Sequence, residues 1–127
     1  MRFMVMVKAN KDSEAGVMPE EKLLAAMGKY NEELVKAGVL LAAEGLHPSS
    51  KGARVKFSGD KRTVTDGPFT EAKEIIGGYA QFELKSKEQA VESAVKFMEL
   101  HKKYWPGWEG ETEVRQMYGP DEVIPTK

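Results

Sequence analysis

The opening stretch of the chain, residues 2–8, is apolar at both sets of alternating positions. Phe3, Val5 and Val7 share one face of an extended strand, and Met4 and Met6 share the other. A strand that is apolar on both faces is normally covered on both faces. Helices of the same chain can cover one face, so the pattern predicts a second subunit on the other.

A first amphipathic helix is predicted over residues 19–37 by apolar positions that recur every three or four residues. Pro19 suits the opening turn, and Gly38 suits the position just after the end. The predicted apolar stripe consists of Leu23, Leu24, Met27, Tyr30, Leu34 and Val35.

A second helix is predicted after residues 86–89, which form a Ser-x-x-Gln capping box. Its apolar stripe is predicted to be Ala90, Val91, Ala94, Val95 and Met98. The helix ends in basic residues, which suit the negative end of a helix dipole as cations, namely His101, Lys102 and Lys103. An aromatic loop, residues 104–108, follows.

Further stretches have the composition of β-strands. Residues 39–46 predict a second buried strand, and residues 78–84 and 113–118 predict two more. Between them, residues 53–58 alternate apolar and polar positions, and residues 62–65 return after a turn sequence. This pair predicts a β-hairpin with one buried face.

The predicted order of elements is β-α-β-(β-hairpin)-β-α-β in a single domain, residues 1–127. Without the hairpin, this is the split βαβ order of ferredoxin-like α+β folds. Two helices then lie on one face of an antiparallel sheet and leave the other face open. Since two such sheets can stack face to face, about 10 Å apart, the sequence predicts a homodimer through the open sheet face, a dimeric α+β barrel.

Composition narrows the classes of partner and chemistry. The 127 residues include 19 basic and 20 acidic residues, without a long run of one sign, which argues against nucleic-acid binding. The absence of cysteine excludes disulfides and a thiol nucleophile and fits a reducing cytoplasm. The apolar N-terminal run is too short for a membrane span or a signal peptide. Two separated histidines form no metal motif, and no cofactor is predicted.

Residues 65–74 form neither a good strand nor a good helix, because Gly67 and Pro68 interrupt any regular ladder. Asp66 stands directly before this bend and Phe69 directly after it. Asp66 is the strongest candidate for a general base or a polar anchor. The alternative is that its carboxylate accepts hydrogen bonds from its own turn, and that Phe69 is a core or pocket-wall residue.

Other polar residues are weaker candidates. His47 can titrate near neutral pH and is a candidate partner of Asp66, or else a solvated loop histidine. Glu44 lies in an apolar strand, where it lines a pocket or faces solvent. Glu74 belongs to a charged rim or a solvated turn. Arg54 and Arg62, on the hairpin, are candidates for binding an anion or are simply solvated.

The run Val64-Thr65-Asp66-Gly67-Pro68-Phe69-Thr70-Glu71-Ala72-Lys73-Glu74, followed by Gly77-Gly78-Tyr79, resembles the signature of the YCII-related, DGPF-domain family, and residues 38–46 resemble its second strand. The resemblance implies a dimeric α+β barrel with a pocket that includes the DGPF residues and Tyr79. Shorter relatives are proposed to use a His–Asp dyad, with the histidine on the first helix. This chain has no histidine there.

Two classes of function follow. One is a small-molecule pocket near the DGPF segment, with acid–base chemistry by Asp66 and His47 and binding contacts from Glu44, Gly67, Pro68, Phe69, Glu74 and Tyr79. The other is a non-catalytic interaction or regulatory module. For the second, the resemblance implies a link to sigma-factor-dependent transcription, because many longer relatives are encoded beside such factors.

Overall fold

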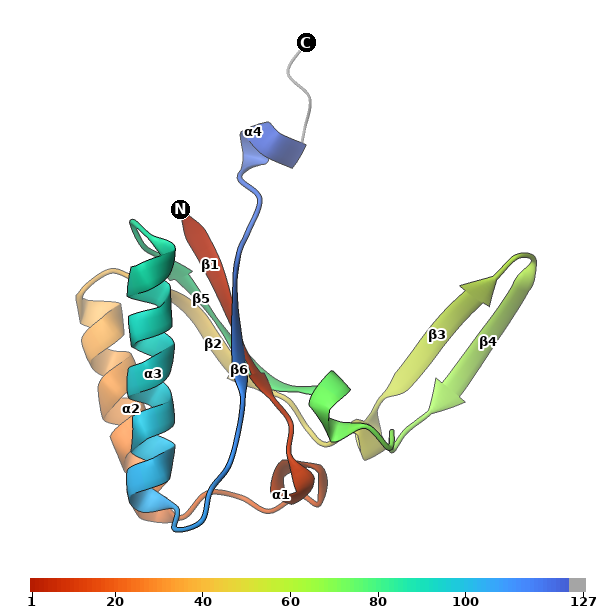
Figure 1. The fold of residues 1–127 in the computed structure, drawn as a ribbon, viewed down its shortest axis with the longest axis horizontal. Coiled ribbons are helices and arrows are strands. Elements are labelled where there is room, and N and C mark those ends of the chain that lie inside the picture. Colours follow the sequence, from red (N-terminus) through yellow and green to blue (C-terminus); the bar gives the residue numbers. More distant parts are fainter. Residues whose placement is uncertain (124–127) are drawn as a thin grey trace.

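The strands form a four-stranded antiparallel sheet in the computed structural model, which describes residues 1–123 (Figure 1). The sheet strands are β1 (Arg2–Lys8), β2 (Leu40–Gly45), β5 (Ile76–Glu83) and β6 (Thr112–Gln116). Their order is β2-β5-β1-β6, and all three pairings are antiparallel. This is the sheet order of the predicted split βαβ arrangement, and the α+β ferredoxin-like fold is confirmed.

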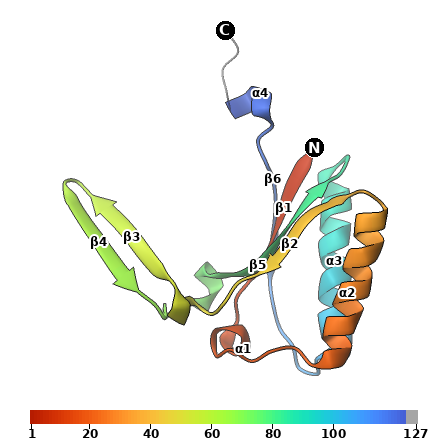
Figure 2. The same ribbon diagram turned by 180° about the vertical axis from the view of Figure 1, so that it is seen from behind.

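Two long helices, α2 (Glu21–Lys36) and α3 (Lys87–Tyr104), lie side by side on one face of this sheet (Figures 1 and 2). The core between them and the sheet centres on Val5, Phe82 and Ala94. Around these pack the partly buried side chains of Leu34, Val39, Leu40, Ala80, Leu84 and Val114. Leu23, in the first turn of α2, is completely buried.

The buried stripe of each helix is narrower than predicted. Leu24 and Val35 on α2 are exposed, as are Val91 and Val95 on α3. The physical reason is that each helix meets the sheet along one line of contact. Small residues, Ala90 and Ala94, line the buried side of α3, and the flanking valines reach beyond the edge of the core.

Short elements occupy stretches that were predicted to be loops. Helix α1 (Lys11–Glu14) is fixed by a reciprocal capping box between Asn10 and Ser13. Three further short elements are the 3-10 turns η1 (Ser49–Lys51) and η2 (Ala72–Glu74) and the helix α4 (Pro120–Val123). Both α1 and η1 carry residues that hold the candidate site.

The hairpin strands β3 (Ala53–Ser58) and β4 (Lys61–Asp66) form a separate two-stranded sheet. Residues 53–66, named the arm below, project away from the main sheet on the side opposite the helices (Figures 1 and 2). Every residue of β3 and β4 is exposed, so the prediction of a half-buried hairpin was wrong for the single chain. Alternation shows that one face is apolar, but it does not show what covers that face.

The sheet face opposite the helices, named the open face below, is covered by no other element of residues 1–123. Met6 stands at its centre, between Tyr79 on β5 and Glu113 on β6, and Glu44 stands beyond Tyr79. Met6 and Tyr79 are half-buried, whereas Glu44 is exposed. This confirms that the second face of the first strand is apolar and that no other element of residues 1–123 covers it.

At the end of α3, His101 is buried between two aromatic rings. The ring centroids of Phe97 and Trp108 lie 4.6 and 4.9 Å from its own. Its Nδ1–H donates to the Phe97 carbonyl oxygen over 3.0 Å. Burial lowers the pKa of His101, and the hydrogen bond only partly opposes this effect. The expectation of a favourable cation here is therefore reversed, because desolvation outweighs the hydrogen bond to the Phe97 carbonyl oxygen.

We expect this burial to make folding sensitive to mild acid. The unfolded chain binds a proton at His101 near pH 6.5, whereas the folded chain binds it only at lower pH. The free energy of unfolding should therefore fall as the pH drops through about 6.5 toward the lower folded-state pKa. Urea unfolding at several pH values would measure this slope in the wild type and in His101→Asn.

The difference in unfolding free energy between the wild type and His101→Asn should be constant above pH 7 and should change with pH below it. His47→Gln, which removes the other, exposed histidine, is the matched control and should keep the wild-type slope. Parallel pH curves for the wild type and His101→Asn would contradict the assignment.

Candidate functional site

The DGPF loop, residues 66–69, lies against the segment of residues 49–52 that follows β2. The Gly67 N–H donates to the Gly52 carbonyl oxygen over 2.9 Å. A Cβ atom on Gly67 would lie 1.8 Å from the Ser49 carbonyl oxygen, so the approach leaves room for glycine alone. The Gly67–Pro68 peptide bond is cis. Backbone contact thus fixes the position of the loop.

Ser49 joins three segments at this contact. Its side chain is almost completely buried, and its hydroxyl donates to a carboxylate oxygen of Glu14 on α1. The Ser49 N–H donates to the other carboxylate oxygen of Glu14 over 2.8 Å. The Phe69 N–H then donates to the Ser49 hydroxyl oxygen over 3.0 Å. The Glu14–Ser49–Phe69 chain of hydrogen bonds, named the clamp below, holds the loop.

Asp66 is exposed at the end of β4, opposite Ala53. Its carboxylate is not used by its own turn, because the Gly67 N–H donates to Gly52, Pro68 has no N–H, and the Phe69 N–H donates to Ser49. No hydrogen bond or ion pair within residues 1–123 engages the Asp66 side chain. The carboxylate is therefore available to a ligand.

His47 and Asp66 lie in the same region of the fold. His47 is exposed and precedes Ser49 by two residues, while Asp66 directly precedes Gly67, which touches Ser49. The end of β2 is held in place because the Leu46 N–H donates to the Gly77 carbonyl oxygen over 2.9 Å. The structure joins the two loops through their backbones, and it shows no hydrogen bond between the two side chains.

Phe69 carries the second contact of the loop. Its half-buried ring lies under the Arg54 guanidinium, which is 3.9 Å from the ring centroid. This cation–π contact fixes a positive charge at the base of the arm, one residue away from the Ala53–Asp66 pair. Arg54 and Asp66 thus stand at neighbouring pair positions at the root of the arm, on opposite faces of the hairpin.

The remaining predicted binding residues are more dispersed. Glu74 is exposed in η2, and Pro68 is exposed in the loop. Tyr79 lies in β5 on the open face, where its neighbour in β2 is Glu44. Glu44 and Tyr79 therefore face the space over the sheet, whereas Asp66 and His47 lie in the loops at the end of β2.

Two hollows formed by residues 1–123 contain none of the predicted site residues. A broad, open depression of about 610 Å³ lies at the opposite end of the sheet. Its lining consists of Met1, Leu34, Val39, Glu83, Leu84, Lys85, Gln89, Glu92, Ser93 and Lys96. A smaller hollow of about 220 Å³ is lined by Gln116, Met117, Tyr118 and Glu122.

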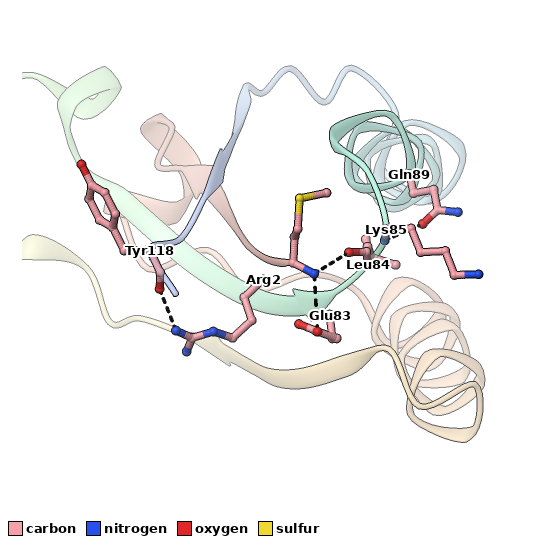
Figure 3. A network of polar contacts seen from close by, with 7 residues as sticks. Arg2, Glu83, Leu84, Lys85, Gln89 and Tyr118 are labelled. Carbon is pink, nitrogen blue, oxygen red and sulfur yellow. Dashed lines mark hydrogen bonds and ion pairs between the residues drawn. The ribbon is translucent and has the colours of Figure 1, made fainter. Parts of the chain in front are cut away.

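Several residues that line these hollows make polar contacts (Figure 3). The Met1 amino group donates to the Leu84 carbonyl oxygen over 3.0 Å and lies 3.5 Å from the Glu83 carboxylate. The Arg2 guanidinium donates to the Tyr118 carbonyl oxygen over 2.8 Å. These contacts connect strand ends, and they lie far along the sheet from the DGPF loop.

Sequence reasoning missed two residues of the clamp, Glu14 and Ser49. Both lie in polar stretches without periodicity, and the hydrogen bonds join residues 35 positions apart. The Asn-x-x-Ser capping sequence of residues 10–13 was the one local signal for α1, and it says nothing about Ser49.

Within residues 1–123, no group of three or more histidine, aspartate or glutamate side chains is arranged to hold a metal ion. In the same part of the chain, no helix combines the length and the apolar character needed to cross a membrane.

Comparison with known proteins identifies the family. An uncharacterized protein of Rhizobium meliloti (strain 1021) is 28% identical over 75 residues, which are 59% of this chain, and the chain spans 60% of that relative's length. The structure of 5-chloro-2-hydroxyhydroquinone dehydrochlorinase from Burkholderia phenoliruptrix AC1100, in complex with 2,5-dihydroxybenzoquinone, matches 93% of this chain and 94% of its own at 18% identity and a TM-score of 0.46. The model of the YCII-related domain matches residues 1–97, and the chain belongs to the YCII-related family.

Proposed function

We propose that this protein acts as a cytoplasmic homodimer that binds a small organic anion beside the DGPF loop, where Asp66 and His47 supply acid–base chemistry. The observation that carries this proposal is the state of Asp66. Its loop is held rigidly by the buried Ser49, and yet its carboxylate is exposed and engaged neither by its turn nor by a counter-ion within residues 1–123. A group held in place but left unpaired is suited to act on a ligand.

The charge at the root of the arm supports an anionic ligand. The Arg54 guanidinium is held over the Phe69 ring, so little of its conformational freedom remains to be lost when it binds. A planar guanidinium pairs well with a carboxylate or a phenolate. Asp66 or His47 can then exchange a proton with another part of the same molecule.

The open face supports the homodimer. Its central positions are occupied by Met4 and Met6, with Tyr79 beside them, and half-buried apolar groups on an uncovered sheet favour stacking against a second sheet. In a symmetric dimer the open faces of two copies would enclose Glu44 and Tyr79. A dimer would thereby convert an open surface into an enclosed pocket.

An interaction or regulatory module, with a link to sigma-factor-dependent transcription, is the second candidate function. The fully exposed arm favours it, because a projecting hairpin with an apolar face is suited to contact another protein.

The anion site is tested by a thermal-shift screen of small carboxylates and phenolates. We expect at least one compound to stabilise the wild type, by about 2.7 kcal/mol at 100 times its Kd. Arg54→Gln should lose this stabilisation. Lys56→Gln, which removes a cation from the same face of β3 without a contact to Phe69, is the matched control and should keep it.

The same compounds separate the roles of Asp66. Asp66→Asn should melt like the wild type without ligand, because the carboxylate makes no hydrogen bond in the folded chain. If Asp66 anchors the ligand, the variant should lose binding. If Asp66 is a general base, the variant should keep binding and lose turnover. If no anion stabilises the wild type and Asp66→Asn itself lowers the melting temperature by several degrees, the segment is structural and the proposal fails.

The clamp is tested by Ser49→Ala. This change leaves the Phe69 N–H without its buried acceptor and removes one of the two bonds to the Glu14 carboxylate, and it should cost about 1–3 kcal/mol of unfolding free energy. Ser50→Ala, at the exposed neighbouring position, should stay within about 0.5 kcal/mol of the wild type. Denaturant unfolding measures both, and equal effects at the two serines would show that the clamp contributes nothing.

The dimer is tested by light scattering with Met6→Glu. The wild type should have twice the mass of one chain at micromolar concentration. A carboxylate at the centre of the stacked sheets should produce a monomer, because it would be buried without a partner. Met18→Glu places the same charge at a side chain that is 73% exposed before α2, and it should remain a dimer. A monomeric wild type would refute the interface.

A further inference from the structure

One face of the arm is apolar and uncovered. Val55 pairs with Val64 across the hairpin, and Phe57 pairs with Arg62, so these side chains share one face. The exposed fractions of Val55, Phe57 and Val64 are 62%, 71% and 57%. The three large apolar side chains form a continuous surface, named the arm face below.

No other strand of residues 1–123 pairs with the arm. β3 and β4 hydrogen-bond only to each other, and a lone two-stranded hairpin is marginally stable in water. Such a hairpin is ordinarily stabilised by a third strand or by another layer that packs on its apolar side. The single chain provides none, so the arm face needs a partner to be stable.

The position of the arm indicates which partner this is. The arm leaves the domain on the side of the open face, away from α2 and α3 (Figures 1 and 2). A second copy that stacks on the open face therefore stands beside the arm. By two-fold symmetry, each of the two arms then meets the opposite copy in the same way.

Charge supports the same partner. The arm holds four basic residues, Arg54, Lys56, Lys61 and Arg62, and two acidic ones, Asp60 and Asp66. The rest of the chain holds fifteen basic and eighteen acidic residues, so a basic arm extends from an acidic body. On the open face of that body Glu44 is exposed, while Glu113 is already paired with Lys8 and Arg115. Opposite charges favour contact between the arm of one copy and the body of the other.

We propose that the arm is a dimerisation arm, whose face of Val55, Phe57 and Val64 packs against a second copy of this chain. This inference rests on the proposed homodimer and extends it. The strands of the arm carry Arg54 and Asp66 at their root, so its contact with the partner also fixes the two charged groups of the anion site.

The direct test is photo-crosslinking from a benzoylphenylalanine at position 57, in a mixture of ¹⁴N- and ¹⁵N-labelled chains. We expect crosslinked peptides that pair a light chain with a heavy chain. A dimer in which position 57 crosslinks only within its own chain, or not at all, would overturn the arm proposal and leave the sheet interface standing.

The energetic test compares dimer dissociation constants by analytical ultracentrifugation. The pair of substitutions Phe57→Ser and Val64→Ser should weaken the dimer by roughly tenfold or more, since buried aromatic anchors dominate interfaces. Val35→Ser and Val91→Ser, at exposed valines on α2 and α3, are the matched control and should leave it unchanged.

The outcomes separate the two proposals. If the wild type dimerises, Met6→Glu abolishes the dimer and the arm variant dimerises normally, the arm is not an interface element. If neither the wild type nor any variant dimerises, the sheet interface and the arm fail together. In that case a surviving response of the wild type to the anion screen would still support the ligand site.

Discussion

The buried hydroxyl of Ser49 is the contact on which the candidate site depends. It donates to the Glu14 carboxylate and accepts from the Phe69 N–H, so one small side chain fastens α1, the turn after β2 and the DGPF loop to one another. Gly67 allows this because its backbone lies directly against the Ser49 carbonyl. Gly67 thus serves to place the loop, and the adjacent Asp66 carboxylate has no hydrogen-bond partner within residues 1–123.

The sheet imposes a second constraint. Both long helices cover one face, so the apolar residues of β1 are divided between a packed core and an open surface. Phe3 and Val5 are buried, while Met4 and Met6 on the other face remain half-buried. In a monomer, polar residues would be expected at positions 4 and 6, because solvent would cover that face. The methionines, which adapt to irregular contacts, are better explained by a partner surface than by solvent.

The fold could be predicted from the sequence because its signals are local. The spacing of Leu23, Met27 and Leu34, the cap at Ser86 and the alternation in the strands each fix an element, and the order of elements then selects the topology. The clamp could not be predicted, because the bond between Glu14 and Ser49 joins two polar stretches through the tertiary structure. His101 was mistaken for a cation for a related reason. Its burial depends on Trp108, which returns after the helix has ended.

The exposure of the arm connects these points. In the arm, the alternation of Val55 and Phe57 with polar residues marks an apolar face that no element of residues 1–123 covers. A hydrophobic pattern does not distinguish a face that the same chain covers from one that a partner would cover. The open face carries the same kind of signal at Met4 and Met6. Both apolar surfaces lie on the same side of one domain, so a single partner could cover them together. A second copy of the chain in a symmetric dimer would do so without any other protein.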